Sequence, residues 1–278
     1  MNKILSFIPG RATKVVRVVR LQGTIRPEGP RSLNLRKVEK FIDKAFDTRR
    51  VKPKAVCLEI NSMGGTVVQS NLIYERIRYL SKTTGVPVLS FAEEYAASGG
   101  YWLALAGDEI FVDPNSFVGS IGVLFGNFGF EESIKKLGIE WRLLTAGKNK
   151  FRMDPFTPLK QEDVDFTTKR LHEIHSNFIE LVKMRRKNVD VNHKTVFTGE
   201  IFTGKEAVSI GLADSVFTDM RGLCRDRYGE DVKFERCEPS GGFLKKFEGF
   251  GSKASIDLSL NDLLVELSEQ QQKARFGF

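Results

Sequence analysis

The 278-residue chain has little cysteine, little histidine and no long hydrophobic run. No stretch of about 18 apolar residues occurs, so the sequence predicts no transmembrane helix. The apolar stretch at the N-terminus is broken by Pro9 and Gly10, and it is shorter than the roughly 7–15 apolar residues of a secretory signal. The three cysteines have no metal-ligand spacing, and their scarcity fits a reducing compartment. These absences predict a cytoplasmic protein that needs no metal and no cofactor.

Positive charge is concentrated at the N-terminal end. Residues 1–54 carry 15 Lys and Arg against 4 Asp and Glu, a balance of +11, whereas the whole chain carries +8. Such a region predicts peripheral contact with an anionic membrane surface or an acidic partner, and a solvated charged face is the alternative. Nucleic-acid binding is not predicted, because the basic residues are not interleaved with aromatic ones and no binding motif occurs.

Apolar runs alternate with helical periods along most of the chain. They predict strands at 15–21, 55–60, 86–91, 109–112 and 141–145, and an extended apolar stretch at 120–125. They predict helices at 35–46, 67–81, 99–106, 131–136, 160–186 and 206–210. Such alternation is typical of an α/β domain with a mostly parallel sheet and right-handed crossovers.

These elements are expected to form one domain over residues 15–238, preceded by a basic segment, residues 1–14. Residues 239–278 are expected to be a linker and a C-terminal helix. Their first part, 239–255, is rich in glycine and serine, and 259–272 has the pattern of a separate helix. A frayed tail is the alternative for this last part.

One serine, Ser98, lies between a predicted strand and a predicted helix in the run Ala-Ala-Ser-Gly-Gly-Tyr-Trp. Free N–H groups and the helix dipole favour negative charge at a helix N-terminus, where a nucleophile and an oxyanion hole can be built together. A second glycine turn, with Gly64 and Gly65, follows the preceding strand. We expect the amides of Gly65 and Gly99 to point at one oxyanion. A plain helix cap and an ordinary strand-to-helix turn are the alternatives.

The base that would activate this serine is a separate question. The three histidines lie on the predicted long helix and in a polar loop, away from strand ends, which favours structural roles for His172, His175 and His193. Two lysines, Lys148 and Lys150, follow a predicted strand. A lysine acts as a base only where burial or nearby positive charge disfavours its charged form. Apolar cover is expected from Phe151, Met153 and Phe156, and a solvated lysine is the alternative.

Seven short segments, spread over most of the chain, have the order and spacing of a known family. They are residues 19–25, 59–65, 95–101, 118–123, 147–150, 202–207 and 211–214. Together they resemble the signal peptide peptidases of the SppA/SohB type over residues 15–216. The resemblance implies a serine endopeptidase with a Ser/Lys dyad. It also implies a ClpP/crotonase-like α/β fold, with repeated ββα units and flanking helices.

The resemblance assigns roles to particular residues. It implies that Ser98 is the nucleophile, that Lys150 is the general base and that Ser120 orients the lysine. The amides of Gly65 and Gly99 would form the oxyanion hole. A neutral lysine would take the hydroxyl proton and later protonate the leaving amine.

Two further expectations concern the base and the substrate. Lys150 is preferred to Lys148 because its spacing from the serine, 52 residues, matches the single-chain members of the family. Apolar walls around Val123 and Leu124 predict a preference for small or apolar side chains beside the cut. The expected substrates are short or unfolded polypeptides.

Assembly is also implied by the resemblance. A short-form protomer is expected to close into a homo-oligomeric ring with dyads lining an inner chamber, and in the family the dyad can straddle a subunit interface. The chain departs from the family at Met63, where the family has proline, and its sequence does not predict the N-terminal membrane anchor that members often carry. Cleaved signal peptides are therefore not a firm expectation for the substrate.

Three other interpretations of the sequence are possible. A ClpP-type protease would need a histidine about 25 residues after the serine, and Val123 stands there. A crotonase-type acyl-CoA enzyme would use the same oxyanion turns, but its carboxylates are missing from them, with Glu93 and Glu94 the nearest. A catalytically silent scaffold or membrane-associated partner is the third interpretation, against which the intact Ser98 and Lys150 argue.

Overall fold

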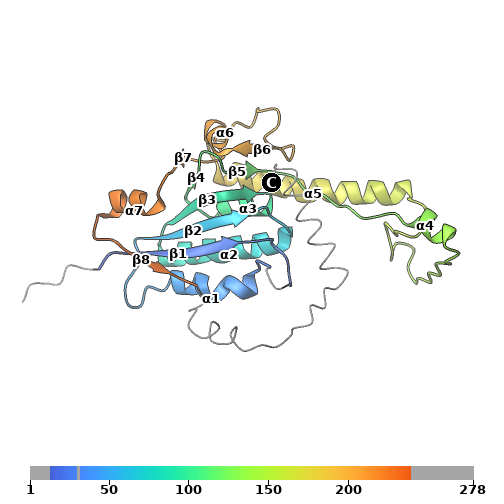
Figure 1. Cartoon of the computed structure of the whole chain (residues 1–278), viewed down its shortest axis with the longest axis horizontal. Helices are drawn as coiled ribbons and strands as arrows, with labels where there is room; N and C mark the ends of the chain where they lie inside the picture. The colour runs from blue at the N-terminus through green and yellow to red at the C-terminus, as the bar shows by residue number, and fades with distance from the viewer. Residues whose placement is uncertain (1–12, 30–31, 239–278) are drawn as a thin grey trace, which may run out of the picture.

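Eight strands form one sheet in the computed structural model, which describes residues 13–29 and 32–238. The strands are β1 (Val15–Gln22), β2 (Ala55–Ser62), β3 (Val88–Ala97), β4 (Glu109–Val112), β5 (Phe117–Gly119), β6 (Ile201–Thr203), β7 (Ser215–Val216) and β8 (Lys233–Arg236). The order is β6-β5-β3-β2-β1-β8, and β4 pairs with both β3 and β7 (Figure 1). Every pair is parallel except β5 with β6, which confirms the expected mostly parallel sheet.

Helices connect these strands on both sides of the sheet. They are α1 (Leu35–Ala45), α2 (Val67–Thr84), α3 (Gly99–Ala104), α4 (Glu131–Lys136), α5 (Gln161–Arg185), α6 (Gly204–Ser209) and α7 (Met220–Tyr228). The linker and helix expected in 239–278, and most of the segment 1–14, lie outside the described residues. Among the described helices, none combines the length and apolar character needed to cross a bilayer.

Two hydrophobic clusters cover the two faces of the sheet. Alternate side chains of β1 and β2 point to opposite faces, because successive residues of a strand do so. Leu58 and Ile60 join the larger cluster with α1, α2, α3 and α5. Cys57 joins the smaller cluster, where its Sγ lies 3.7 Å from that of Cys224 on α7. All the cysteines are free thiols.

The long strand β3 has two neighbours on one side. Its first part, residues 89–92, pairs with β4, and its last part, residues 95–97, pairs with β5. This exchange of partners places the end of β5 beside the end of β3, at the edge of the sheet where Ser98 lies.

The structure differs from the sequence predictions in several places. Residues 141–145 were expected to be a strand but have no regular structure, so that prediction is wrong. Residues 120–125 also form no strand, because β5 ends at Gly119. Strands β6, β7 and β8 and helix α7 were not predicted. Strand β8 pairs with β1, whose Arg17 is 8% exposed and donates to Glu235.

We predict that Phe91→Ala lowers the free energy of unfolding by about 3–5 kcal/mol, because it opens a cavity in the smaller cluster. The Phe91 ring is 1% exposed and stacks on Phe111 at a centroid distance of 5.0 Å. Urea unfolding followed by circular dichroism measures the change. Val191→Ala, at a side chain that is 49% exposed, is the matched control and should change stability by less than about 0.5 kcal/mol. Equal losses in both variants would contradict the assigned core.

Candidate active site

Ser98 sits on a strained turn between β3 and α3. Its φ is +52° and its ψ is −122°, a backbone conformation that residues other than glycine rarely adopt. It caps α3 with no side-chain hydrogen bond to the helix, and it is half-buried. Among the described residues its hydroxyl has no hydrogen-bond partner. The turn therefore presents an uncommitted hydroxyl at the start of a helix, where strain of about 1–3 kcal/mol is often tied to function.

The glycine turn after β2 packs directly against this serine. Gly64 has a φ of +104°, and a Cβ placed on it would lie 2.7 Å from the Gly99 nitrogen and 2.8 Å from the Ser98 Cβ. Neither approach is possible for a residue with a side chain. Glycine is therefore required because two backbone segments touch at this point.

The two amides named from the sequence are close together. A Cβ on Gly99 would lie 3.2 Å from the Gly65 nitrogen. Within residues 13–29 and 32–238, no acceptor is assigned to either the Gly65 or the Gly99 amide, and Gly65 is exposed. Unpaired amides that meet beside a hydroxyl form an arrangement that can stabilise an oxyanion.

Residues that the sequence interpretation missed hold this turn. Ile25 clamps it from the next loop: its amide donates to the Gly64 carbonyl and its carbonyl accepts from Thr66, both at 2.8 Å. Ser62 donates from Oγ to the Gly23 carbonyl at 2.7 Å and accepts from the Gly64 amide. No local pattern could have identified Ile25, because its contact joins segments about 40 residues apart in the sequence.

Helix α3 is fixed to the interior by Tyr101. This side chain is fully buried, and its hydroxyl donates to the Leu212 carbonyl at 2.8 Å. Burial raises the pKa of the Tyr101 phenol well above its ordinary value, so the group stays neutral. A rigid α3 keeps its N-terminal amides in place beside the serine.

Ser120 lies at the end of β5, next to Ser98. Ala97 of β3 is paired with Gly119 of β5, and the Ser98 amide donates to the Gly119 carbonyl at 2.8 Å. Ser120 has a φ of +51°, nearly that of Ser98. The structure therefore brings together the two serines predicted from the sequence, at the ends of adjacent parallel strands and with nearly the same positive φ.

The apolar residues predicted to line the substrate site follow Ser120 directly. Val123 is half-buried and Leu124 is 75% exposed. The segment is tied to α5 by His175, whose Nε2 lies 2.9 Å from the Ile121 carbonyl oxygen. His175 thus contacts the backbone, as the predicted structural role requires.

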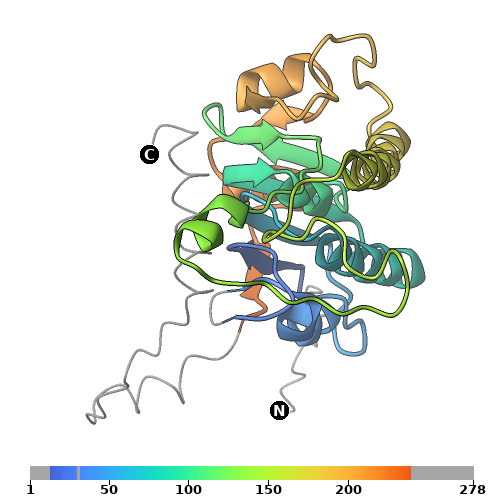
Figure 2. The same cartoon turned by 90° about the vertical axis from the view of Figure 1, so that its right-hand side faces the viewer.

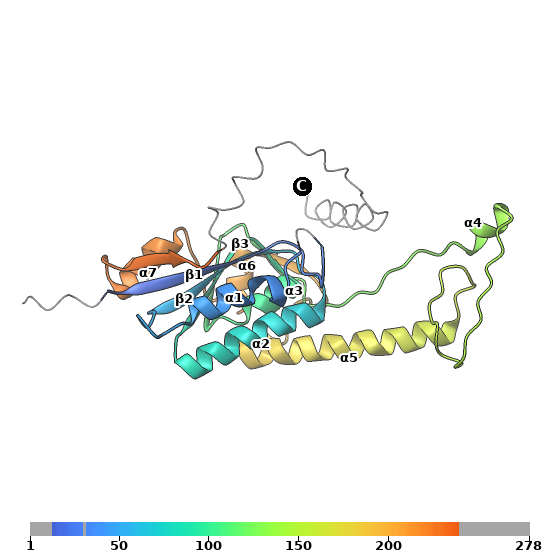
Figure 3. The same ribbon diagram turned by 90° about the horizontal axis from the view of Figure 1, so that it is seen from below.

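Lys150 does not reach these residues within one chain. It lies on a segment that we call the arm, residues 124–160, which carries α4 and stands away from the sheet at the far end of α5 (Figures 1 and 3). Lys150 is exposed, and among the described residues no side-chain bond or ion pair is assigned to it. Phe151, which was expected from the sequence to cover this lysine, is itself 48% exposed.

Contacts within the arm join its segments to one another and to α5. Trp141 packs on Phe156 at 4.9 Å and donates from Nε1 to Asp154 at 3.0 Å. Arg152 pairs with Asp163 in the first turn of α5, and both side chains are largely buried. These contacts fix the arm to the projecting end of α5, not to the sheet.

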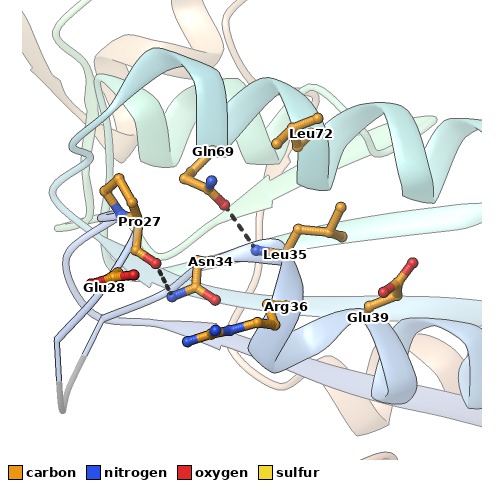
Figure 4. Close-up of a pocket in the computed structure, with 8 residues that line it drawn as sticks. All are labelled: Pro27, Glu28, Asn34, Leu35, Arg36, Glu39, Gln69 and Leu72. Atoms are coloured by element: carbon orange, nitrogen blue, oxygen red, sulfur yellow. Dashed lines mark hydrogen bonds between the residues drawn. The ribbon is translucent and has the colours of Figure 1, made fainter.

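A hollow of about 380 Å³ lies beside the glycine turn, between α1 and the start of α2 (Figure 4). Its walls hold the charged residues Glu28, Arg36 and Glu39. Gln69 accepts from the Leu35 amide at 3.1 Å across it. The hollow lies at the serine's edge of the sheet, and its floor is occupied by hydrogen bonds that cap α1.

Solved structures and sequence relatives agree with this architecture. Two structures of the membrane-bound stomatin-specific protease 1510-N match with a TM-score of 0.52 and 17% identity. They cover 83% and 85% of this chain and 100% and 96% of those chains. The fold is therefore of the ClpP/crotonase-like class. A profile of Peptidase family S49 matches residues 81–221, and the chain belongs to this family.

Two curated relatives align over nearly the whole chain. A protein named Na(+)/H(+) antiporter NhaA from Brucella abortus (strain 2308) is 42% identical over 285 residues, which is 98% of this chain and 38% of that protein. Serine protease SPPA, chloroplastic, from Arabidopsis thaliana is 28% identical over 266 residues, 91% of this chain and 39% of that protein. The chain thus spans about two fifths of the length of these relatives.

We predict that Ser98→Gly raises the free energy of unfolding by about 1 kcal/mol. Glycine relieves about 1–3 kcal/mol of backbone strain and costs about 0.5–1 kcal/mol in chain entropy. Ser209→Gly, at an exposed position in α6 with ordinary backbone angles, is the control and should be destabilising. Urea unfolding of both variants decides the matter, and a loss of stability in Ser98→Gly would argue against strain at the turn.

Proposed function

We propose that this protein is a serine endopeptidase that hydrolyses peptide bonds in short or unfolded polypeptides. The observation that carries the proposal is the Ser98 turn, where, within the described part of the chain, a hydroxyl without a partner lies beside the unpaired amides of Gly65 and Gly99. Membership of Peptidase family S49 supports the same reaction. The relatives are longer proteins, and the antiporter name describes a protein of which this chain spans 38%, so we do not extend ion transport to it.

The reaction follows from these groups. The amine of Lys150 takes the Ser98 proton, and the serine oxygen attacks the peptide carbonyl carbon. The oxyanion that forms accepts hydrogen bonds from Gly65 and Gly99. The C–N bond then breaks, and the leaving amine takes its proton from the lysine. Water, activated by the same lysine, hydrolyses the acyl-serine and releases the carboxylic acid.

A second copy of the chain would supply the lysine. Within one chain Lys150 is exposed on the arm, whereas a lysine serves as a base only where burial disfavours its charge. A neighbouring subunit that seats the arm beside its own Ser98 would bury the amine and complete the dyad. Ser120, at the end of β5, would accept a hydrogen bond from that amine and orient it. Activity would then depend on contact between subunits, as expected from the sequence.

The substrate would lie along the segment after Ser120. Val123 and Leu124 present apolar side chains there, and we propose that small or apolar substrate residues pack against them beside the cut. A peptide library would show this preference, and cleavage confined to positions after charged residues would contradict it.

We predict that Ser98→Ala and Lys150→Ala each lower the hydrolysis of unfolded casein and of short fluorogenic peptides, Lys150→Ala by about 10²–10⁴-fold. Lys148→Ala is the matched control, since it removes a neighbouring charge and should leave the rate within a few-fold of the wild type. Size-exclusion chromatography with light scattering shows whether each variant assembles normally. Inactivity of a correctly assembled wild type would favour the scaffold interpretation, and full activity of Lys150→Ala would identify another base.

Mixing the two inactive variants tests the shared dyad. If one copy supplies the serine and another the lysine, a mixture of Lys150→Ala and Ser98→Ala subunits regains part of the wild-type rate. Both inactive variants are measured alone at the same concentration as controls. A mixture as inactive as its components would mean that serine and lysine belong to the same copy.

A further inference from the structure

A groove runs between α2 and α5 on the helical side of the sheet. It encloses about 590 Å³ and is lined mainly by apolar side chains, among them Val67, Val68, Leu72, Trp102, Leu181 and Met184. Figure 3 shows the two helices side by side, and Figure 2, which looks along α5, shows both on the same side of the sheet. We call this surface the α2–α5 groove.

The groove is exposed although it is apolar. Val68 is 67% exposed and Met184 is 56% exposed, one from each wall. Trp102 forms part of the lining and is 5% exposed, and its Nε1 has no hydrogen-bond partner in the described part of the chain. Contiguous apolar surfaces with few polar groups are typical of interaction sites.

The arm is the second apolar surface left uncovered. Helix α4 has no buried residue. Eleven large apolar side chains of the arm are at least 42% exposed: Leu124, Phe125, Phe128, Phe130, Leu137, Ile139, Trp141, Leu143, Leu144, Phe151 and Leu159. Because α5 is 25 residues long and carries the arm beyond the edge of the sheet, the arm does not fold back onto its own groove (Figure 3).

We infer that the α2–α5 groove of one subunit receives the arm of another copy of this chain. This inference rests on the proposed function, because it names the surface that brings Lys150 to a neighbour's Ser98. The groove begins at Val67, two residues after Gly65 of the oxyanion turn. An arm seated in it lies alongside the turn, and its own 147–150 turn comes to the serine's edge of the sheet.

The two surfaces are different, so the contact is heterologous. Each subunit gives an arm on one side and receives an arm on the other, and such contacts generate rings when the rotation closes. The subunit that receives the arm provides Ser98, and the subunit that gives the arm provides Lys150. This direction is the testable content of the inference.

The molar mass in solution is the first test. We expect Met184→Asp in the groove and Leu144→Asp in the arm, where the side chain is 99% exposed, each to convert the assembly to monomers. Tyr79→Asp is the matched control, because Tyr79 is on α2, is 60% exposed and does not line the groove. If Leu144→Asp dissociates the assembly while Met184→Asp does not, the arms pack on one another and the inference is overturned.

Direction is tested with the mixture of Lys150→Ala and Ser98→Ala subunits. Met184→Asp on the Lys150→Ala subunit, which bears the active serine, should lower the restored rate at least tenfold. The same change on the Ser98→Ala subunit should lower it less than threefold. Equal effects would overturn the groove while the shared dyad stands. A mixture with no restored rate would contradict the shared dyad, and the molar masses would then decide the groove alone.

Discussion

The whole site depends on backbone packed against backbone where β2 and β3 end. The Gly64 turn touches Ser98 and Gly99 at distances that admit no side chain between them. Parallel pairing of β2 with β3 sets these two ends side by side. The carbonyl and amide of Ile25 hold the Gly64 turn in place through hydrogen bonds. The Ser98 hydroxyl, the Gly65 and Gly99 amides and Ser120 then occupy one edge of the sheet because β5 pairs with the last residues of β3.

The serine and the lysine of the proposed site are supported differently. The serine and its amides are held by a sheet, a buried Tyr101 and a short helix, so their geometry needs no partner. The lysine is carried on an arm whose apolar residues face water in a single chain. Burial of such a surface is favourable, by roughly 25 cal/mol for each Å² of apolar area, so assembly and completion of the dyad would be driven by the same contact.

Local patterns predicted most elements well because they report burial and period. Helix α4 has the predicted bounds, and β1, β2, α1 and α5 differ by a few residues at their ends. The strand expected at 141–145 fails because β-forming side chains need a neighbouring strand, and the arm provides none. Helix α7 was missed because it is short and charged. Strands β6, β7 and β8 were missed because they have only two to four residues each and form by pairing with neighbouring strands.

The sequence by itself determined the fold class, the serine on a strand-to-helix turn and the need for glycine near it. These features follow from local conformation and from the alternation of apolar residues. Only the tertiary structure decided that Gly65 meets Gly99, that Ser120 stands beside Ser98, and that Lys150 is held away from both. Such relations depend on strand register and on which surfaces remain uncovered after folding, and neither is written in any local stretch of the chain.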